Sequence, residues 1–253
     1  MKKLNVRDIR KSKQNKLQVL TCYDYQTATL LNQLDLDMIL VGDSLGNVML
    51  GYDTTVEVSL TEMEIFASAV RRGAPDKFLI VDMPFGSYST ISQGIHSATK
   101  LFQKTKSEAV KLEGAFPYQL KLIERLTQTG IPVMGHIGLT PQSVHQLGGY
   151  FTHGKNETSA DKLIKEAKAL EAAGAFSLVL EMVDENVATT ISQVLSIPTI
   201  GIGAGSKTDG QVLVINDLLK LGPKTPPKFC TPIADLYAEK KQLLEKYLKD
   251  QRK

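Results

Sequence analysis

The chain has 253 residues, 42% of them hydrophobic, and a formal net charge of +3. A length of about 250 residues suits one barrel-type domain, and this charge gives no reason to expect nucleic acid as a partner. No apolar run approaches the roughly 18 residues that a membrane span needs. Cys22 and Cys230 lie far apart and form neither a metal-binding spacing nor a disulfide framework, which favours a cytoplasmic protein.

Short apolar runs alternate with amphipathic segments along the whole chain. Most of the runs are unbroken rather than alternating, as in strands that are buried on both faces of a parallel sheet. We expect eight strands, near residues 18–23, 38–43, 77–83, 109–113, 131–137, 177–183, 198–203 and 211–216.

The segments between these strands carry helix signals. Two pairs fit a capping box before the run MEIFASAV: Ser59 with Glu62, and Thr61 with Glu64. Three glycines stand where these helices should end: Gly73, Gly130 and Gly174.

The last predicted helix lies near the carboxyl terminus. Thr231 is the expected N-cap, with Pro232 in the first turn. One face of this helix is apolar and carries Leu236, Leu243, Leu244, Tyr247 and Leu248. We expect it to pack on the barrel or on a neighbouring subunit.

Eight strands in 253 residues give about 32 residues per strand–helix unit, the spacing of a (β/α)8 barrel. The sequence therefore predicts a single barrel domain over residues 1–253 that ends in an amphipathic helix. A doubly wound open sheet is the alternative that this pattern leaves open.

Acidic residues stand at the ends of four predicted strands: Asp43, Asp82, Glu113 and Glu181. In such a barrel the carboxyl ends of the strands build the active site, so these side chains should meet at one mouth. A single acidic residue at a strand end is more often a helix cap or a loop acceptor. Four of them in corresponding positions favour a site.

Carboxylates around one mouth repel each other, and a divalent cation neutralises them most simply. Ligands that are all oxygen suit Mg²⁺, which keeps positions open for a chelating substrate. Lys111 points to the same face as Glu113 and is well placed to bind a substrate carboxylate, while Ser44 could add a donor. The residues alone predict a metal-dependent enzyme that acts on a small keto acid.

Two further motifs stay open at this stage. His136 could be a ligand, a proton donor or a hydrogen-bonded core residue. The segment GIGAGS (residues 201–206) is a weak dinucleotide signal, because no helix pattern follows it. It fits a tight turn or a loop that lets a ligand approach the backbone.

Several longer stretches resemble one known family, the ketopantoate hydroxymethyltransferases. They run in the family's order from about residue 21 to 217: TCYDYQTA, LVGDSLGNVMLGYDTT, AVRRGAP, VDMPFGSY, AVKLEG, VMGHIGLTPQSVHQLGGY, ALEAAGAFSLVLE and IPTIGIGAGSKTDGQVLVIND. The combination is far more specific than any single motif.

This resemblance implies a barrel of the phosphoenolpyruvate/pyruvate type and a defined reaction. A hydroxymethyl group would pass from methylenetetrahydrofolate to 3-methyl-2-oxobutanoate, giving 2-dehydropantoate for pantothenate and coenzyme A synthesis, through a Mg-stabilised enolate. The family also implies a homo-oligomer, commonly a decamer.

The resemblance also implies residue roles. Mg²⁺ would be held by Asp43, Asp82 and, directly or through water, Glu113. The keto acid would contact Asp43, Ser44, Asp82 and Lys111. Glu181 would be the general base, and we expect it to lie off the metal in a partly apolar pocket.

Two rival functions remain to be weighed. A carbon–carbon lyase of the same barrel superfamily usually needs a reactive cysteine in an active-site loop, and both cysteines are poorly placed for that role. A barrel that has lost catalysis and serves as a binding protein is disfavoured, because one chain keeps Asp43, Asp82, Lys111, Glu113 and Glu181.

Overall fold

A computed structural model describes residues 3–252 of the chain. Eight parallel strands pair in chain order and close into one barrel. They are β1 (Leu17–Thr21), β2 (Met38–Val41), β3 (Phe78–Asp82), β4 (Ala109–Glu113), β5 (Val133–Gly138), β6 (Ser177–Glu181), β7 (Thr199–Ile202) and β8 (Gly210–Leu213). The predicted barrel is confirmed, and the open-sheet alternative is wrong.

The eighth strand is shorter than predicted. It ends at Leu213, and Ile215–Leu218 form a short helix instead of continuing the strand to residue 216. The apolar run continues past the turn because Ile215 is buried in this helix too. Burial on both sides of a turn hides the turn from a hydrophobic pattern.

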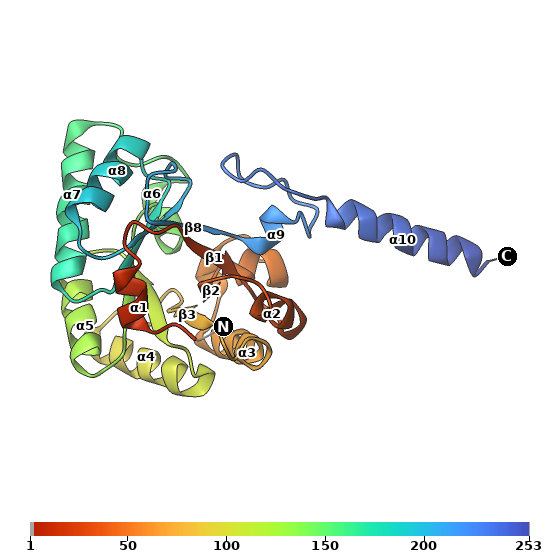
Figure 1. Ribbon diagram of the computed structural model, residues 1–253, viewed down its shortest axis with the longest axis horizontal. Helices are drawn as coiled ribbons and strands as arrows, with labels where there is room; N and C mark the ends of the chain where they lie inside the picture. Colours follow the sequence, from red (N-terminus) through yellow and green to blue (C-terminus); the bar gives the residue numbers. More distant parts are fainter. Residues whose placement is uncertain (1–2, 253) are drawn as a thin grey trace. The chain divides into compact units, whose positions relative to one another are not determined.

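Helices surround the strands within residues 1–212 (Figure 1). The helices of this part are α1 (Val6–Lys11), α2 (Tyr25–Asn32), α3 (Leu60–Gly73), α4 (Ile91–Thr105), α5 (Pro117–Gln128), α6 (Val144–Leu147), α7 (Glu157–Ala172) and α8 (Glu185–Val194). The rest of the chain forms α9 (Ile215–Leu218) and α10 (Leu236–Asp250). Three short turns, η1 (Gly46–Leu50), η2 (Thr55–Glu57) and η3 (Pro141–Ser143), lie in the loops that follow β2 and β5.

The start of α3 shows how local sequence sets a helix boundary. The Glu62 N–H donates to the Ser59 hydroxyl at 3.2 Å, and the Ser59 N–H donates to the Glu62 carboxylate at 2.7 Å. This reciprocal pair satisfies two N–H groups that the first turn leaves free. Of the two predicted capping boxes this one forms, whereas Thr61 lies inside the helix.

The barrel interior is filled by apolar side chains from all eight strands or their immediate flanks. The buried cluster comprises Ile9, Leu17, Val19, Met38, Leu40, Phe78, Ile80, Ala109, Met134, Phe176, Val179, Ile200 and Val212. Ile9 comes from α1, and Arg10 of the same helix donates to the carbonyl groups of Gly174 and Ala175, which precede β6. Helix α1 therefore covers the amino ends of the strands and leaves their carboxyl ends for the site.

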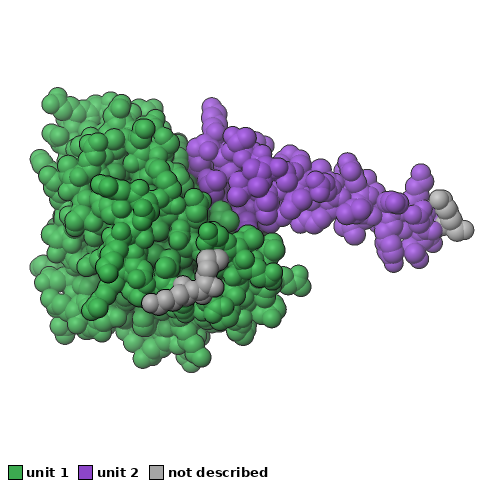
Figure 2. All heavy atoms as spheres, in the orientation of Figure 1, with its two compact units in different colours: residues 1–212 green, residues 213–253 purple. Residues whose placement is uncertain are grey.

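The chain divides into two compact units, residues 1–212 and residues 213–253 (Figure 2). In the second unit α10 begins at Leu236, and its N-cap is Asp235, whose carboxylate accepts the Ala238 N–H at 3.0 Å. The predicted N-cap at Thr231 is wrong, because a carboxylate nearer the helix takes that position. That residues 1–253 form one domain stays a prediction.

Candidate active site

The register of the strands aligns the predicted site residues. Asp82 on β3 is opposite Lys111 on β4, and Glu113 on β4 is opposite His136 on β5. Glu181 on β6 is opposite Gly138, the last residue of β5. Because neighbouring parallel strands end together, these side chains gather at the carboxyl mouth of the barrel.

Lys111 is the cation at the centre of this cluster. Its Nζ lies 3.0 Å from Asp82 Oδ2, and both side chains are almost fully buried. Burial alone would lower the pKa of Lys111, but the charges of Asp82, Glu113 and Asp43 outweigh it and raise that pKa. The ammonium group is therefore charged at neutral pH and partly neutralises the surrounding carboxylates.

His136 joins the two sides of the cluster. Its Nδ1 lies 3.3 Å from Lys111 Nζ and 3.5 Å from Glu113 Oε1, and its Nε2 lies 3.3 Å from Glu181 Oε2. The Nε2 contact is close enough for an ion pair, although its alignment does not make it a hydrogen bond. Burial and Lys111 lower the pKa of His136, but its interactions with Glu113 and Glu181 outweigh them and raise that pKa to about 9.

Asp43 completes the acidic side of the mouth. It follows the end of β2 by two residues, and its N–H donates to Asp82 Oδ2 at 3.1 Å. Burial, and then the charges of Asp82 and Glu113, raise the pKa of Asp43 well above its usual range. The adjacent Ser44 hydroxyl is hydrogen-bonded to the hydroxyl of Tyr23 at 2.8 Å.

The sequence analysis missed two polar residues in this site. Gln142, in η3, donates from Nε2 to Asp43 Oδ2 at 2.8 Å, and Tyr88 donates from its hydroxyl to Gln142 Oε1 at 2.5 Å. Both residues are buried. Tyr88 lies inside the stretch VDMPFGSY and Gln142 inside GHIGLTPQSV, so the family motifs contained them without assigning them a role.

The donor chemistry of the two aspartates fits a hard divalent cation. Among residues 3–252 no three Asp, Glu, His or Cys side chains form a ready-made metal site. Asp82 Oδ1 is nevertheless buried without a hydrogen-bond partner, which is the state a metal-binding oxygen would leave behind. Glu113 Oε2 already accepts the Gln142 N–H at 3.1 Å, so contact through water suits Glu113 better than a direct bond.

Accessibility separates Glu181 from the other carboxylates. Its side chain is 18% exposed, against 3% for both Asp82 and Glu113. We expected Glu181 in a partly apolar pocket, and the structure places its carboxylate against the imidazole of His136 instead. Glu181 is thus more exposed than Asp82 and Glu113.

The other candidates do not join the site. The glycine-rich segment turns after β7, where the Ser206 N–H donates to Glu185 Oε1 at 3.2 Å, and β8 follows it rather than a helix. This geometry gives no support to a dinucleotide site. Cys22 is fully buried, and burial raises its pKa to about 12, so it is not a reactive thiolate.

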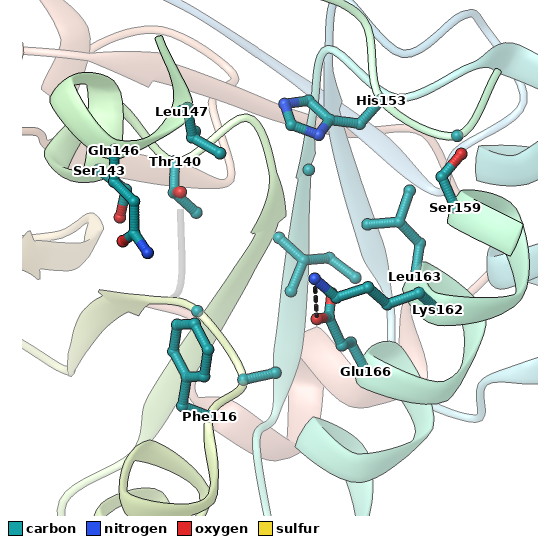
Figure 3. A pocket seen from close by; sticks show the side chains of 15 residues that line it. Phe116, Thr140, Ser143, Gln146, Leu147, His153, Ser159, Lys162, Leu163 and Glu166 are labelled. Atoms are coloured by element: carbon teal, nitrogen blue, oxygen red, sulfur yellow. Dashed lines mark ion pairs between the residues drawn. The ribbon is translucent and has the colours of Figure 1, made fainter. Parts of the chain in front are cut away.

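A separate cavity of about 370 Å³ lies beside β5, between the starts of α5 and α7 (Figure 3). Phe116, His153 and Leu163 line it, and Lys162 Nζ lies 3.7 Å from Glu166 Oε1 at its side. None of the site residues predicted from the sequence lines this cavity.

The sequence pattern of the ketopantoate hydroxymethyltransferase family matches residues 3–253. The chain belongs to this family. A 3-methyl-2-oxobutanoate hydroxymethyltransferase of Leptospira interrogans serogroup Icterohaemorrhagiae serovar copenhageni (strain Fiocruz L1-130) is 49% identical over 95% of this chain and 91% of its own. Its counterpart in Thermotoga maritima is 46% identical over 99% of this chain and 93% of its own.

Solved structures support the fold of this ketopantoate hydroxymethyltransferase family member. A phosphoenolpyruvate phosphomutase from Streptomyces platensis subsp. rosaceus superposes with a TM-score of 0.68 at 14% identity, covering 98% of this chain and 88% of the other. A 2,3-dimethylmalate lyase of the PEP mutase/isocitrate lyase superfamily gives a TM-score of 0.64 at 14% identity, over 98% and 87% of the two chains. These likenesses support the closed barrel fold. Across the described part of the chain, no helix is both long and apolar enough to cross a membrane.

Proposed function

We propose that this chain is a 3-methyl-2-oxobutanoate hydroxymethyltransferase. It transfers a one-carbon unit from methylenetetrahydrofolate to 3-methyl-2-oxobutanoate and gives 2-dehydropantoate, a step of pantothenate synthesis. Membership of the family supports the reaction, and the close relatives carry the name of this enzyme. The observation that carries the chemistry is one accessible carboxylate, Glu181, beside a buried group of carboxylates around Lys111.

The buried carboxylates are the proposed cation site. Asp43 and Asp82 would hold Mg²⁺ directly, and Glu113 would contact it through water. When bound, Mg²⁺ would supply Lewis-acid polarisation of the keto carbonyl, which acidifies the proton on the neighbouring carbon. The unpartnered Asp82 Oδ1 supports this assignment.

The residues of this chain bind and orient the keto acid. Lys111 offers an ammonium group for the substrate carboxylate, and Asp43, Ser44 and Asp82 would contact the keto acid. Lys111 and the Asp43 N–H both lie against Asp82 Oδ2, at 3.0 Å and 3.1 Å. Because Lys111 is charged and nearly dry, its attraction for a carboxylate is screened much less than that of a surface lysine.

Glu181 is the proposed general base. It takes the proton from the β-carbon, and that carbon then forms the new bond to the methylene carbon brought by the folate. The two carbon–nitrogen bonds that hold this methylene to the folate break, and tetrahydrofolate leaves. Water balances the overall reaction by supplying the hydroxyl oxygen. His136, protonated because its pKa is raised to about 9, holds the Glu181 carboxylate in place from the barrel side.

The test of this role is deuterium exchange at the β-carbon of 3-methyl-2-oxobutanoate in D₂O, followed by NMR without folate. We expect wild type to exchange with Mg²⁺ and not with EDTA. Glu181→Gln with Mg²⁺ should be slower by about 10²–10⁴-fold, the usual contribution of a general base. The matched control is Glu166→Gln, a carboxylate outside the cluster that pairs with Lys162. Exchange that persists in Glu181→Gln would show that another group is the base.

The working protein is, on the same reasoning, a cytoplasmic homo-oligomer, and the family resemblance favours a decamer. The exposed apolar face of α10 supports contact between copies of the chain.

A further inference from the structure

Gln142 makes contacts that reach well beyond its own loop. It lies in η3 after β5 and is buried, with 6% of its surface exposed. Its Nε2 donates to Asp43 Oδ2 at 2.8 Å, after β2, and to the Met83 carbonyl at 2.9 Å, after β3. Its backbone N–H donates to Glu113 Oε2 at 3.1 Å, on β4. One residue thus connects the ends of three strands to the loop of a fourth.

The orientation of the Gln142 amide is determined by its partners. Both N–H groups of Nε2 are used, and Oε1 accepts the hydroxyl of Tyr88 at 2.5 Å. A reversed amide would place Oε1 against a carboxylate and a carbonyl, which are both acceptors. Asp43 Oδ2 and the Met83 carbonyl therefore select the orientation of the amide, and the Tyr88 hydroxyl stabilises it by donating to Oε1.

This donor acts on a carboxylate that has few favourable neighbours. Asp43 is buried beside Asp82 and Glu113, which repel its charge. Gln142 engages only Oδ2, so the other oxygen of Asp43 is left for a ligand. The two oxygens of Asp82 also differ in their partners. Oδ2 contacts the Lys111 ammonium group and accepts the Asp43 N–H, whereas Oδ1 has no hydrogen-bond partner.

We propose that Gln142 is a positioning residue for the divalent cation site, and that Tyr88 holds Gln142 in its working orientation. Gln142 places Asp43 through its side chain and Glu113 through its main chain. The inference rests on the proposed function, because it assumes that Asp43 and Glu113 serve a divalent cation.

The test measures Mn²⁺ binding by electron paramagnetic resonance and calorimetry, with no keto acid or folate present. Gln142→Met keeps the length of the side chain and the backbone N–H but removes the amide. We expect its Mn²⁺ dissociation constant to rise by about 10- to 100-fold, the usual effect of losing a partner that orients a metal ligand. Tyr88→Phe should raise it by about 2- to 10-fold, the range of a single neutral hydrogen bond.

The matched control is Gln119→Met. Gln119 is also buried, but its amide contacts only backbone groups, the Glu113 carbonyl at 2.7 Å and the Phe116 N–H at 2.8 Å. We expect this variant to lose stability and to bind Mn²⁺ as wild type does. Circular dichroism and urea unfolding establish that each variant is folded before binding is measured.

A double variant separates the proposed linkage from general damage to the loop. If Tyr88 acts through Gln142, then Tyr88→Phe combined with Gln142→Met should bind Mn²⁺ as Gln142→Met alone does, within about 2-fold. If the double variant raised the Mn²⁺ dissociation constant by the product of the two single increases, the linkage would be overturned. Wild-type affinity in folded Gln142→Met would overturn the positioning role. Wild type that binds no Mn²⁺ would instead overturn the metal assignment in the proposed function.

Discussion

At the scale of single residues, the site holds like charges close together, and their repulsion destabilises the fold when no ligand is bound. Asp43, Asp82 and Glu113 share a dry mouth in which Lys111 and His136 supply the opposing charge. Burial is the largest cause of the raised pKa of Asp43 and of Asp82. Without a bound cation, the protein should therefore be less stable than a variant in which neutral side chains replace these carboxylates.

Asp43→Asn should raise the stability of the metal-free protein. The folded-state pKa of Asp43 lies above its unfolded value of 3.8, so the native state holds a proton that the unfolded state releases. Stability is then lost as pH rises from the unfolded pKa through the folded one. Asparagine does not ionise, so this loss of stability disappears, and its amide oxygen still accepts the hydrogen bond from Gln142. We therefore expect the free energy of unfolding to rise by about 0.5–2 kcal/mol in neutral buffer with EDTA.

Urea unfolding in mildly acidic and in neutral buffer checks the prediction. The contrasting variant is Asp209→Asn, because burial raises the pKa of Asp209 but the bonds from Thr199, Lys13 and Gln14 outweigh it and lower that pKa. Asp209 thus contributes stability above its unfolded pKa, and its loss should destabilise the protein in neutral buffer. Equal effects of the two substitutions would contradict this account.

Lys111→Met should destabilise the fold severely. It removes the ammonium group that lies 3.0 Å from Asp82 and leaves the buried carboxylates without this opposing charge. Breaking a comparable buried pair lowers the free energy of unfolding by about 3–5 kcal/mol. The control is Lys100→Met, whose partner Glu64 lies 3.2 Å away with both side chains partly exposed. That substitution should cost no more than about 1 kcal/mol. Similar urea midpoints for the two variants would show that Lys111 does not hold the cluster together.

The acidic strand ends were predictable residue by residue, whereas their partners were not. Glu113 and Glu181 stand at the ends of apolar runs, so strand register alone brings them to one mouth. Gln142 and Tyr88 lie in loops, where the path of the backbone depends on tertiary contacts and no periodicity records it. The sequence therefore identified the charges of the site but not the neutral residues that orient them.

At the scale of elements, the end of β5 determines how Glu181 is presented. Gly138 has φ +95°, and a Cβ there would lie 2.2 Å from the Glu181 carbonyl oxygen. That carbonyl accepts the Leu139 N–H at 2.8 Å, so the close approach belongs to the pairing of β5 with β6. Glycine is required here both for its backbone angle and for its size.

Gly138→Ala should therefore cost more than an ordinary substitution of a positive-φ glycine. The matched control is Gly148→Ala, with φ +78° and no atom within 4 Å of the added Cβ. We expect the control to lose about 1–2 kcal/mol from the backbone angle alone. Gly138→Ala should lose about 1–3 kcal/mol more from the clash and should also slow deuterium exchange by displacing Glu181. Urea unfolding and the exchange assay check both parts, and equal losses of stability would exclude the clash as a cause.

Element boundaries were less predictable than element types. All eight strands form where apolar runs predict them, because a strand in a closed parallel barrel is buried on both faces. The start of α10 was misplaced because Thr231 and Asp235 are both good caps, and Asp235 also forms an ion pair with Lys220. A contact between distant residues decided between two locally acceptable caps.

At the scale of the whole molecule, α10 carries a group of exposed apolar side chains. None of its residues is buried, and its exposed apolar side chains are Tyr237, Leu243, Leu244, Tyr247 and Leu248. Neighbouring apolar side chains on one helix that stay in water indicate a surface that another surface covers. We expect that cover to come from a second copy of the chain.

Leu244→Glu combined with Leu248→Glu should therefore lower the mass of the assembly measured by light scattering. Wild type is expected at a multiple of 27.8 kDa, and at ten times that mass if the family's decamer holds. The control exchanges Lys241 and Glu245, which lie 3.8 Å apart on the same helix, and so keeps their pairing while changing the surface charge pattern. It should leave the mass unchanged. Because charge at an apolar contact is costly to bury, only the leucine variant should dissociate, and a wild-type mass in that variant would show that α10 does not hold the copies together.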